Sequence, residues 1–198
     1  MIYIGIHGPK RIGKDTFAKN LKQAFMDVGE PRVAIGRIAD PLYNWAADIT
    51  GWMVDDLMGS RKDDKWNTGN APIPSLAGHS PRDMLLDLGL FVRDKYGEAF
   101  MVQALKRDYN KNRFCRIVLV VDVRTNVEAE AMDFVFDLER DGCVYAGGRT
   151  ESNLTTGVLR KLTLKTCEDT TQAIDFKALA DSLEKESWNL EALKKESL

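Results

Sequence analysis

The stretch of sequence that decides the fold runs from residue 2 to residue 16 and reads IYIGIHGPKRIGKDT. Residues 2–7 form a short apolar and β-branched run that ends at Gly8-Pro9, which predicts a buried strand. Apolar side chains then recur at helical spacing over residues 16–28, which predicts an amphipathic helix. Between the strand and the helix, Gly8, Gly13 and Lys14 have the spacing G-x-x-x-x-G-K of a phosphate-binding loop.

The chemistry of phosphate explains why glycine and lysine are needed at these positions. Glycines let backbone N–H groups turn inward around phosphate oxygens, the N-terminus of the following helix adds positive potential, and the lysine reaches the terminal phosphates. Lys10 and Arg11 could add charge near the phosphates or could simply be solvated. The plainer alternative for the whole stretch is a glycine-rich turn with one solvated lysine.

Asp15 departs from the usual pattern, because Ser or Thr normally follows the lysine and binds magnesium through its hydroxyl group. The Asp15 carboxylate could bind the metal directly or through water, or the metal could be held elsewhere. Thr16 is less well placed for this role because it lies one residue later. The loop alone therefore leaves the metal ligands open.

The composition indicates a soluble globular protein with one domain, or one domain carrying an inserted flap. The chain has 198 residues, 44% of them hydrophobic, and its 28 Lys and Arg against 30 Asp and Glu give a net charge of −2. This balance argues against extended disorder and against broad binding to nucleic acid. Three widely spaced cysteines and no long apolar run point to the reducing cytoplasm and away from a membrane.

Strand and helix signals alternate along the chain. Further strands are expected at residues 32–38, 117–121, 143–146 and 162–164, and further helices from 40, from 80, over 98–109, from 125 to about 140, and over 176–193. Ser80 with Asp83, and Thr125 with Glu128, have the spacing of helix N-caps. This alternation predicts an α/β three-layer sandwich with a mostly parallel five-stranded sheet.

The segment 51–78 lacks a helical or strand period and is rich in Gly, Asp, Asn, Lys and Pro. A long irregular segment of this kind is usually a functional flap or a disordered loop. Trp52 and Trp66 within it, and Trp45 and Tyr43 just before it, could stack on a nucleobase or could anchor the flap on the core.

Asp122 directly follows the most hydrophobic run of the chain, Ile117-Val118-Leu119-Val120-Val121. An acid at this point is typical of one that holds a magnesium-bound water beside a phosphate loop, and its alternative is an ordinary turn or helix-capping residue. Arg124 would project near the same edge of the sheet, where it could bind a transferred phosphate or form a surface salt bridge.

Four blocks in consistent order carry a resemblance to a known family: GKDT at 13–16, ADPL at 39–42, SPRDMLLDLG at 80–89 and DVR at 122–124. Together they resemble the deoxynucleoside monophosphate kinases of bacteriophages, over residues 1 to about 148. The resemblance implies a P-loop NTPase domain like that of nucleoside monophosphate kinases, with a monophosphate-binding insertion at about 40–110 and a short lid at about 147–161. It further implies phosphoryl transfer from ATP to a deoxynucleoside monophosphate with Mg²⁺, in the host cytoplasm if the chain is of phage origin, and makes a homodimer plausible.

The resemblance, together with the loop chemistry and the helical spacing of Arg93 from Arg82, assigns roles to individual residues. For Arg93 and the two lid arginines the alternative is an ordinary solvated side chain. Those expected to bind ATP are Gly8, Lys10, Arg11, Ile12, Gly13, Lys14, Asp15, Thr16 and, in the lid, Arg149, with Arg160 as a second lid arginine. Those expected to bind the acceptor are Asp40, Arg82, Arg93, Asp122 and Arg124. Lys14, Arg82 and Arg124 are the expected catalytic residues. Asp15 and Asp122 are the expected metal ligands.

Two other functions fit the same motifs. One is another small-molecule kinase with this loop, acting on dephospho-coenzyme A or phosphomevalonate, and the other is an ATP-dependent switch with little turnover. Transfer to a phosphate acceptor needs no general base, because the acceptor is already an anion. The two histidines, His7 and His79, lie in an expected strand end and a loop and give little support to a histidine relay.

Overall fold

The computed structural model describes residues 1–111, 114–139, 154, 159–163 and 174–196. Its contacts divide the chain into two units, the first made of residues 1–37 with 106–198 and the second of residues 38–105. The second unit begins and ends close to the bounds of about 40 and 110 expected for an inserted segment. Each unit is described by itself. No helix in these described ranges is long and apolar enough to cross a membrane.

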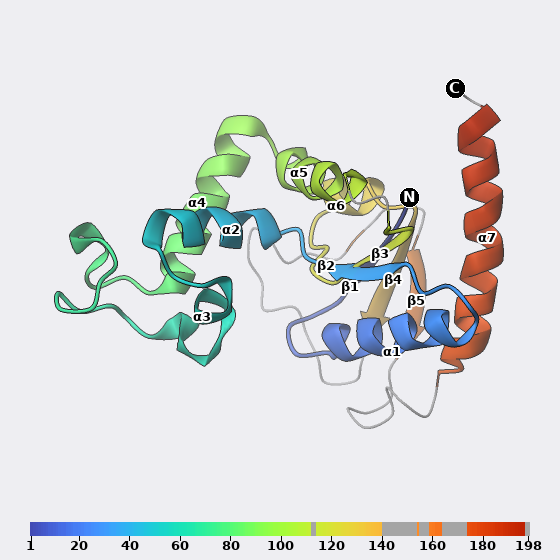
Figure 1. The fold of residues 1–198 in the computed structure, drawn as a ribbon, viewed down its shortest axis with the longest axis horizontal. Coiled ribbons are helices and arrows are strands. Elements are labelled where there is room, and N and C mark those ends of the chain that lie inside the picture. Colours follow the sequence, from blue (N-terminus) through green and yellow to red (C-terminus); the bar gives the residue numbers. More distant parts are fainter. Residues whose placement is uncertain (112–113, 140–153, 155–158, 164–173, 197–198) are drawn as a thin grey trace. The chain divides into compact units, whose positions relative to one another are not determined.

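The first unit is built on one parallel sheet (Figure 1). Its strands, in the spatial order β2-β3-β1-β4-β5, are β1 (Ile2–His7), β2 (Val33–Gly36), β3 (Ile117–Val120), β4 (Phe134–Glu139) and β5 (Leu159–Thr163). Its helices are α1 (Lys14–Asp27), α6 (Asn126–Glu130) and α7 (Phe176–Glu196), while α5 (Ala99–Asn110) crosses from the second unit into the first. The expected α/β class with a parallel sheet flanked by helices is confirmed.

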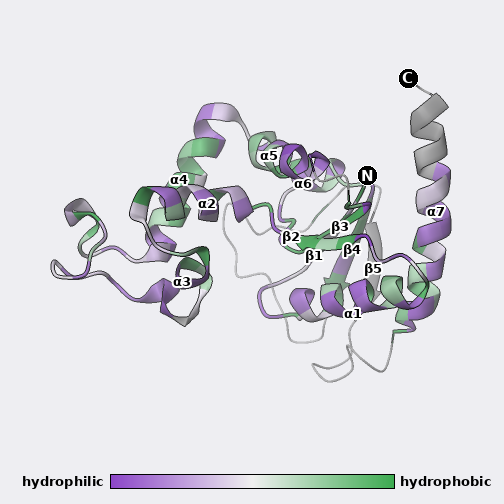
Figure 2. Cartoon of the chain, viewed as in Figure 1, coloured by the Kyte–Doolittle hydropathy of each residue, from purple (hydrophilic) through white to green (hydrophobic). Residues whose placement is uncertain are grey.

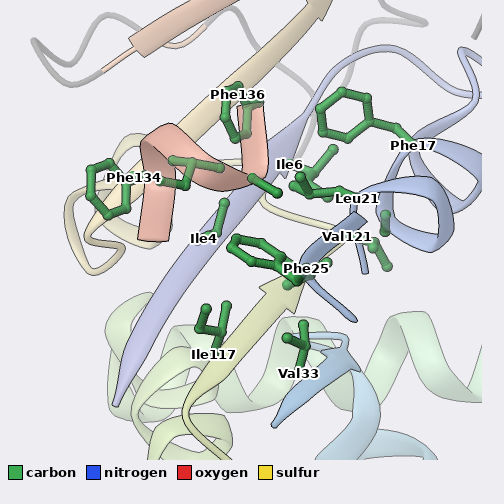
Figure 3. Close-up of a cluster of buried hydrophobic side chains, with 14 of the residues drawn as sticks. Ile4, Ile6, Phe17, Leu21, Phe25, Val33, Ile117, Val121, Phe134 and Phe136 are labelled. Carbon is green, nitrogen blue, oxygen red and sulfur yellow. The ribbon is translucent and has the colours of Figure 1, made fainter. Parts of the chain in front are cut away.

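The core of the first unit lies between the sheet and helices α1 and α7. Side chains of a strand alternate between its faces, so Ile2, Ile4 and Ile6 all point toward this core. In Figure 3, Phe17, Leu21 and Phe25 of α1 lie against the isoleucines of β1 and their neighbours on β3 and β4. Figure 2 shows the same division by colour, with hydrophobic strands and a two-sided α1.

The opposite face of the sheet is covered by α6 and the end of α5. Tyr3 of β1 donates its hydroxyl to Asn110 Oδ1 at 3.0 Å and to the Lys106 carbonyl oxygen at 3.2 Å. Burial is the main cause that raises the pKa of Tyr3 to about 12. Tyr109 donates to the Ile35 carbonyl oxygen at 3.2 Å. The sheet therefore has helices on both faces, as expected for three layers.

The second unit contains α2 (Asp40–Thr50), α3 (Val54–Met58) and α4 (Pro81–Tyr96), with the short 3₁₀ helices η1 (Ser60–Asp63) and η2 (Pro74–Leu76). The predicted N-cap of α4 is confirmed, because Ser80 and Asp83 form a capping box. The segment 51–78 holds more local structure than its composition suggested.

Trp66 ties this segment together. Its backbone N–H donates to the His79 carbonyl oxygen at 2.8 Å, and its backbone carbonyl oxygen accepts from the Gly78 N–H at 2.7 Å. Its ring is 3% exposed and meets the Trp52 ring edge-on, with the ring centroids 5.3 Å apart. Trp66 therefore holds the segment together from within.

The helix expected from Thr125 to about Arg140 is wrong beyond its first turn. Thr125 and Glu128 form the predicted capping box, but α6 ends at Glu130 and β4 begins at Phe134. Phe134, Phe136 and Leu138 point into the core on alternate positions, and the residues between them face the other side. A short apolar run fits both periods, and burial in the sheet decides for the strand.

Two expectations near the C-terminal end have different outcomes. The strand expected at 143–146 lies outside the described residues, as does the predicted lid over 147–153 and 155–158. The strand expected at 162–164 is β5, which begins earlier, so residues 159–161 belong to the sheet and not to a lid loop. In β5, Arg160 pairs with Phe136 of β4. The C-terminal helix begins at Phe176 as predicted.

A buried ionic cluster joins the amino end of the sheet to α7. Glu30, 2% exposed, accepts hydrogen bonds at 2.9 Å from Arg116 Nη1 and Arg32 Nη2. Arg116 also donates to Ser187 Oγ at 2.9 Å, and its guanidinium carbon lies 4.0 Å from the centre of the Trp188 ring. Burial acts to raise the pKa of Glu30, but the hydrogen bonds from Arg32 and Arg116 outweigh it, so this pKa lies below its ordinary value.

We expect Glu30→Gln to lower the free energy of unfolding at pH 7 by about 3 kcal/mol, because the substitution leaves the buried Arg116 charge without its partner. The native pKa is depressed, so this contribution is present above the unfolded-state pKa and disappears as the pH falls through the native pKa. Urea unfolding at a series of pH values measures it. Glu130→Gln, at an exposed position, is the control. A difference between wild type and Glu30→Gln that stays constant into strong acid would contradict the prediction.

Candidate phosphate-binding site

The loop between β1 and α1 has an unusual backbone. Three of its residues have positive φ angles: Gly8 at 143°, Arg11 at 65° and Gly13 at 105°. Arg11 is the only non-glycine residue with positive φ in the described part of the chain. Backbone that enters the left-handed region turns successive N–H groups to one side and forms an anion-binding concavity. Residues 8–14 are therefore the candidate phosphate-binding loop.

Lys14 begins α1 and reaches back across this loop. Its Nζ donates to the Gly8 carbonyl oxygen at 2.6 Å and to the Pro9 carbonyl oxygen at 2.8 Å. The first N–H groups of a helix have no acceptor within the helix, and they point along its axis. The ammonium group and the N-terminus of α1 therefore belong to one loop, which is the combination that favours a phosphate group.

Two contacts hold the loop against the sheet. The Ile12 side chain is fully buried in the core, so within the predicted site it serves as an anchor. A Cβ on Gly8 would lie 2.8 Å from the Leu138 carbonyl oxygen of β4, which only glycine avoids. Lys10, Arg11, Asp15 and Thr16 are exposed.

The sheet brings the segment after β3 beside this loop (Figure 1). β1 and β3 pair in parallel with Gly5 opposite Val120, so the residues following both strands lie at the same edge. The chain leaves β1 through α1 toward β2, and leaves β3 through α6 toward β4 on the other side of β1. Such a reversal of direction is where open parallel sheets bind ligands.

Asp122 and Arg124 both lie at this edge. Asp122 is half-buried and Arg124 is exposed. The Arg124 N–H donates to Glu128 Oε2 at 2.8 Å, and the Thr125 N–H donates to the same oxygen at 3.2 Å. Glu128 thus has two roles: it caps α6, and it holds the backbone N–H of Arg124 in place.

The carboxylates near the loop are few. Asp15 Oδ1 accepts from Arg37 Nη2 at 3.0 Å, and no group of three or more His, Cys, Asp or Glu that could hold a metal exists among the described residues. Mg²⁺ usually binds through one or two carboxylates together with substrate phosphates and water. Within the described part of the chain, Asp15 and Asp122 do not form a metal cage by themselves.

Sequence reasoning missed His7 and Asp137 at this edge. Both are buried, with exposed fractions of 2% and 5%, and they face each other in the register of β1 and β4. His7 Nδ1 lies 2.8 Å from the Val123 carbonyl oxygen. The sequence did contain a signal for His7: a histidine at the end of an apolar strand is expected to be buried, and its ring nitrogens then need hydrogen-bond partners inside the protein.

The second unit holds three of the residues expected to bind the acceptor, Asp40, Arg82 and Arg93. Arg82 binds Asp63 through its Nε and, at 3.4 Å, through its Nη2. The hydrogen bond with Asp63 raises the pKa of Arg82, which keeps the guanidinium charged. Asp40 is the first residue of α2, and Arg93 is half-buried on α4, three turns after Arg82. Arg149 lies outside the described residues.

A scan of the chain against protein-family models found no match, and a search of curated proteins found none that matches. The geometry described above therefore carries the functional argument.

We expect Gly8→Ala to lower the free energy of unfolding by about 2 kcal/mol, because alanine is strained at this φ and its Cβ collides with β4. Gly29→Ala is the matched control, since Gly29 also has positive φ but open space around its Cβ position, and it should cost about 1 kcal/mol. Only Gly8→Ala should weaken binding of inorganic triphosphate, measured by calorimetry. Equal effects of both substitutions on binding would remove Gly8 from the site.

Proposed function

We propose that this protein is a deoxynucleoside monophosphate kinase on a P-loop NTPase fold, which transfers the γ-phosphoryl group of ATP to a deoxynucleoside monophosphate and releases ADP. The observation that carries the proposal is the backbone of residues 8–14, where three positive φ angles precede Lys14 at the N-terminus of α1. Positive φ angles of this kind, a lysine and a helix N-terminus together favour phosphate binding. The resemblance of four sequence blocks to phage kinases supplies the substrate class.

On the donor side, the loop N–H groups and Lys14 bind the phosphate chain of ATP. Lys14 Nζ already lies against the loop carbonyls, so a small movement suffices to place its charge on a phosphate oxygen. Asp15 and Asp122 would hold Mg²⁺, which when bound neutralises charge on the phosphates. Arg124, exposed at the same edge as Asp122, adds a cation for the transferring group.

On the acceptor side, Arg82 is the principal residue of the second unit. Asp63 uses two of its guanidinium N–H groups and orients the fork, and the remaining N–H groups can bind the monophosphate. Asp40 and Arg93 are the further residues assigned to this side. A guanidinium that is pre-oriented by a carboxylate loses less entropy when it binds a phosphate.

Phosphoryl transfer requires no covalent bond between these residues and the substrate. The acceptor is an anionic phosphate, so no side chain has to remove a proton. Catalysis depends on holding two phosphates in line and on spreading positive charge over the moving group. Lys14 and Arg124 are the residues of the first unit proposed to supply this charge, and Arg82 is the residue of the second unit proposed to bind the acceptor phosphate. Water competes as an acceptor, so the residues must favour transfer only when the monophosphate is bound.

A coupled assay of ADP release tests the proposal. The purified protein is given MgATP with each deoxynucleoside monophosphate, with dephospho-coenzyme A, with phosphomevalonate, and with no acceptor. Turnover that requires a deoxynucleoside monophosphate supports the proposal. Turnover only with one of the other acceptors assigns a different small-molecule kinase, and ATP binding without acceptor-dependent turnover favours a nucleotide switch.

Lys14→Ala should lower kcat by at least about 10²–10³-fold, because a preorganised charge at the transferring phosphate is lost. The fold should remain intact, since Lys14 is only half-buried and lies outside the core. Steady-state kinetics and circular dichroism measure the two effects. Lys19→Ala, at an exposed position of the same helix, should leave kcat unchanged. Near-normal kcat for Lys14→Ala would count against the kinase.

Arg82→Ala should raise KM for the monophosphate or lower kcat by about tenfold or more, with little effect on ATP affinity, because charged hydrogen bonds to phosphate each contribute about 1.5–3 kcal/mol. Arg61→Ala provides the control, since Arg61 is an exposed arginine of the same unit. Initial rates with each substrate varied in turn give both constants. A loss confined to ATP would move Arg82 to the donor side.

A further inference from the structure

His7 is a buried polar residue at the carboxyl end of the central strand β1. It is the last residue of β1, 2% exposed, and Gly8 of the phosphate-binding loop follows it directly. The other side chains of β1 are apolar or, for Tyr3, mainly aromatic. Burying an imidazole ring costs free energy unless its polar atoms find partners. The partners of the His7 ring therefore indicate the role of this side chain.

The ring of His7 lies between the segment that follows β3 and the neighbouring strand β4. Its Nδ1 lies 2.8 Å from the Val123 carbonyl oxygen, and because a carbonyl oxygen only accepts, Nδ1 carries the hydrogen. Its Nε2 lies 3.9 Å from Asp137 Oδ1 on β4, which is too long for a hydrogen bond but is an electrostatic contact. The Nδ1 contact is a direct hydrogen bond.

The hydrogen bond to Val123 joins two parts of the candidate site across 116 positions of sequence. Val123 stands between Asp122 and Arg124, beyond the last paired residue of β3. Backbone pairing with β1 does not extend to this segment in the register that ends at Gly5 and Val120. Backbone hydrogen bonds join β1 to β3, and the His7 side chain adds a hydrogen bond from the end of β1 to the segment after β3.

We propose that His7 is a positioning residue: its Nδ1–H holds the Asp122–Arg124 segment at a fixed place beside the phosphate-binding loop. The catalytic part of this inference rests on the proposed function. Misplacing catalytic groups by about 1 Å can cost about 10²-fold in rate. Under the proposed function the loop holds the phosphates of ATP, so loss of the tie should lower kcat more than it raises KM for ATP.

Three variants separate the hydrogen bond from general packing. The side-chain amide nitrogen of Asn occupies the place of Nδ1, and that of Gln the place of Nε2, so His7→Asn keeps a donor for Val123 and His7→Gln does not. His7→Leu removes both donors. We expect kcat per folded molecule to fall by about 10²-fold in His7→Gln and His7→Leu and to be largely restored in His7→Asn. A purely structural role predicts lower stability in all three variants and the same kcat per folded molecule.

Amide hydrogen exchange tests the hydrogen bond between His7 and Val123 without an activity assay. Peptides covering residues 121–130 should exchange faster in His7→Gln and His7→Leu than in wild type and His7→Asn, because the Arg124 and Thr125 N–H groups lose their fixed position against Glu128. Peptides from 176–189 in α7 serve as the internal control. If His7→Leu does not fold, as circular dichroism would show, the comparison of Asn with Gln carries the test.

The outcomes distinguish this inference from the proposed function. If the wild-type protein transfers no phosphate to any acceptor, the kinase proposal fails, and the exchange comparison alone decides the role of His7. If the wild type is an active kinase and the Asn and Gln variants share one kcat and one exchange pattern, the tie through Nδ1 is wrong while the kinase stands.

Discussion

The parallel pairing of β1 with β3 on one side and with β4 on the other is the constraint on which the candidate site depends. These ladders place the carboxyl ends of three strands at one edge of the sheet. Residues 7–14, 122–124 and 137 are far apart in the chain, and only this strand order makes them neighbours. Side chains on a loop are useful for binding when a rigid scaffold holds the loop, and the sheet is that scaffold.

The two ends of the sheet differ in how they are held. At the amino end, Glu30 and Arg116 are buried and bonded to each other, and Arg116 also bonds Ser187 of α7. At the carboxyl end, the loop has positive φ angles at three residues, one of them Arg11, and its charged side chains are exposed. Strained backbone persists only where the surrounding structure enforces it. Here the buried Ile12 side chain and the close approach of Gly8 to Leu138 hold the loop in this conformation.

Local signals in the sequence predicted much of the fold. The strand at 2–7, the capping boxes of Ser80 and Thr125 and the helix start at Phe176 depend on neighbouring residues, and the structure has them all. The strand at Phe134–Glu139 was missed because its apolar residues also fit a helical period, and only pairing with β1 decides between the two. The pairs His7 with Val123 and Glu30 with Arg116 depend on strand order, which no local pattern contains.

The local charge of the loop makes the proposed site for a highly charged ligand compatible with a nearly neutral chain. The protein has a net charge of −2, yet the loop and the first turn of α1 carry Lys10, Arg11 and Lys14 against the single carboxylate of Asp15. Asp15 in turn pairs with Arg37 on the surface, where both side chains are substantially exposed. An exposed pair of this kind contributes at most about 1 kcal/mol. Asp15 can therefore leave Arg37 for a metal ion at little cost, so a carboxylate in place of the usual hydroxyl is compatible with phosphate binding.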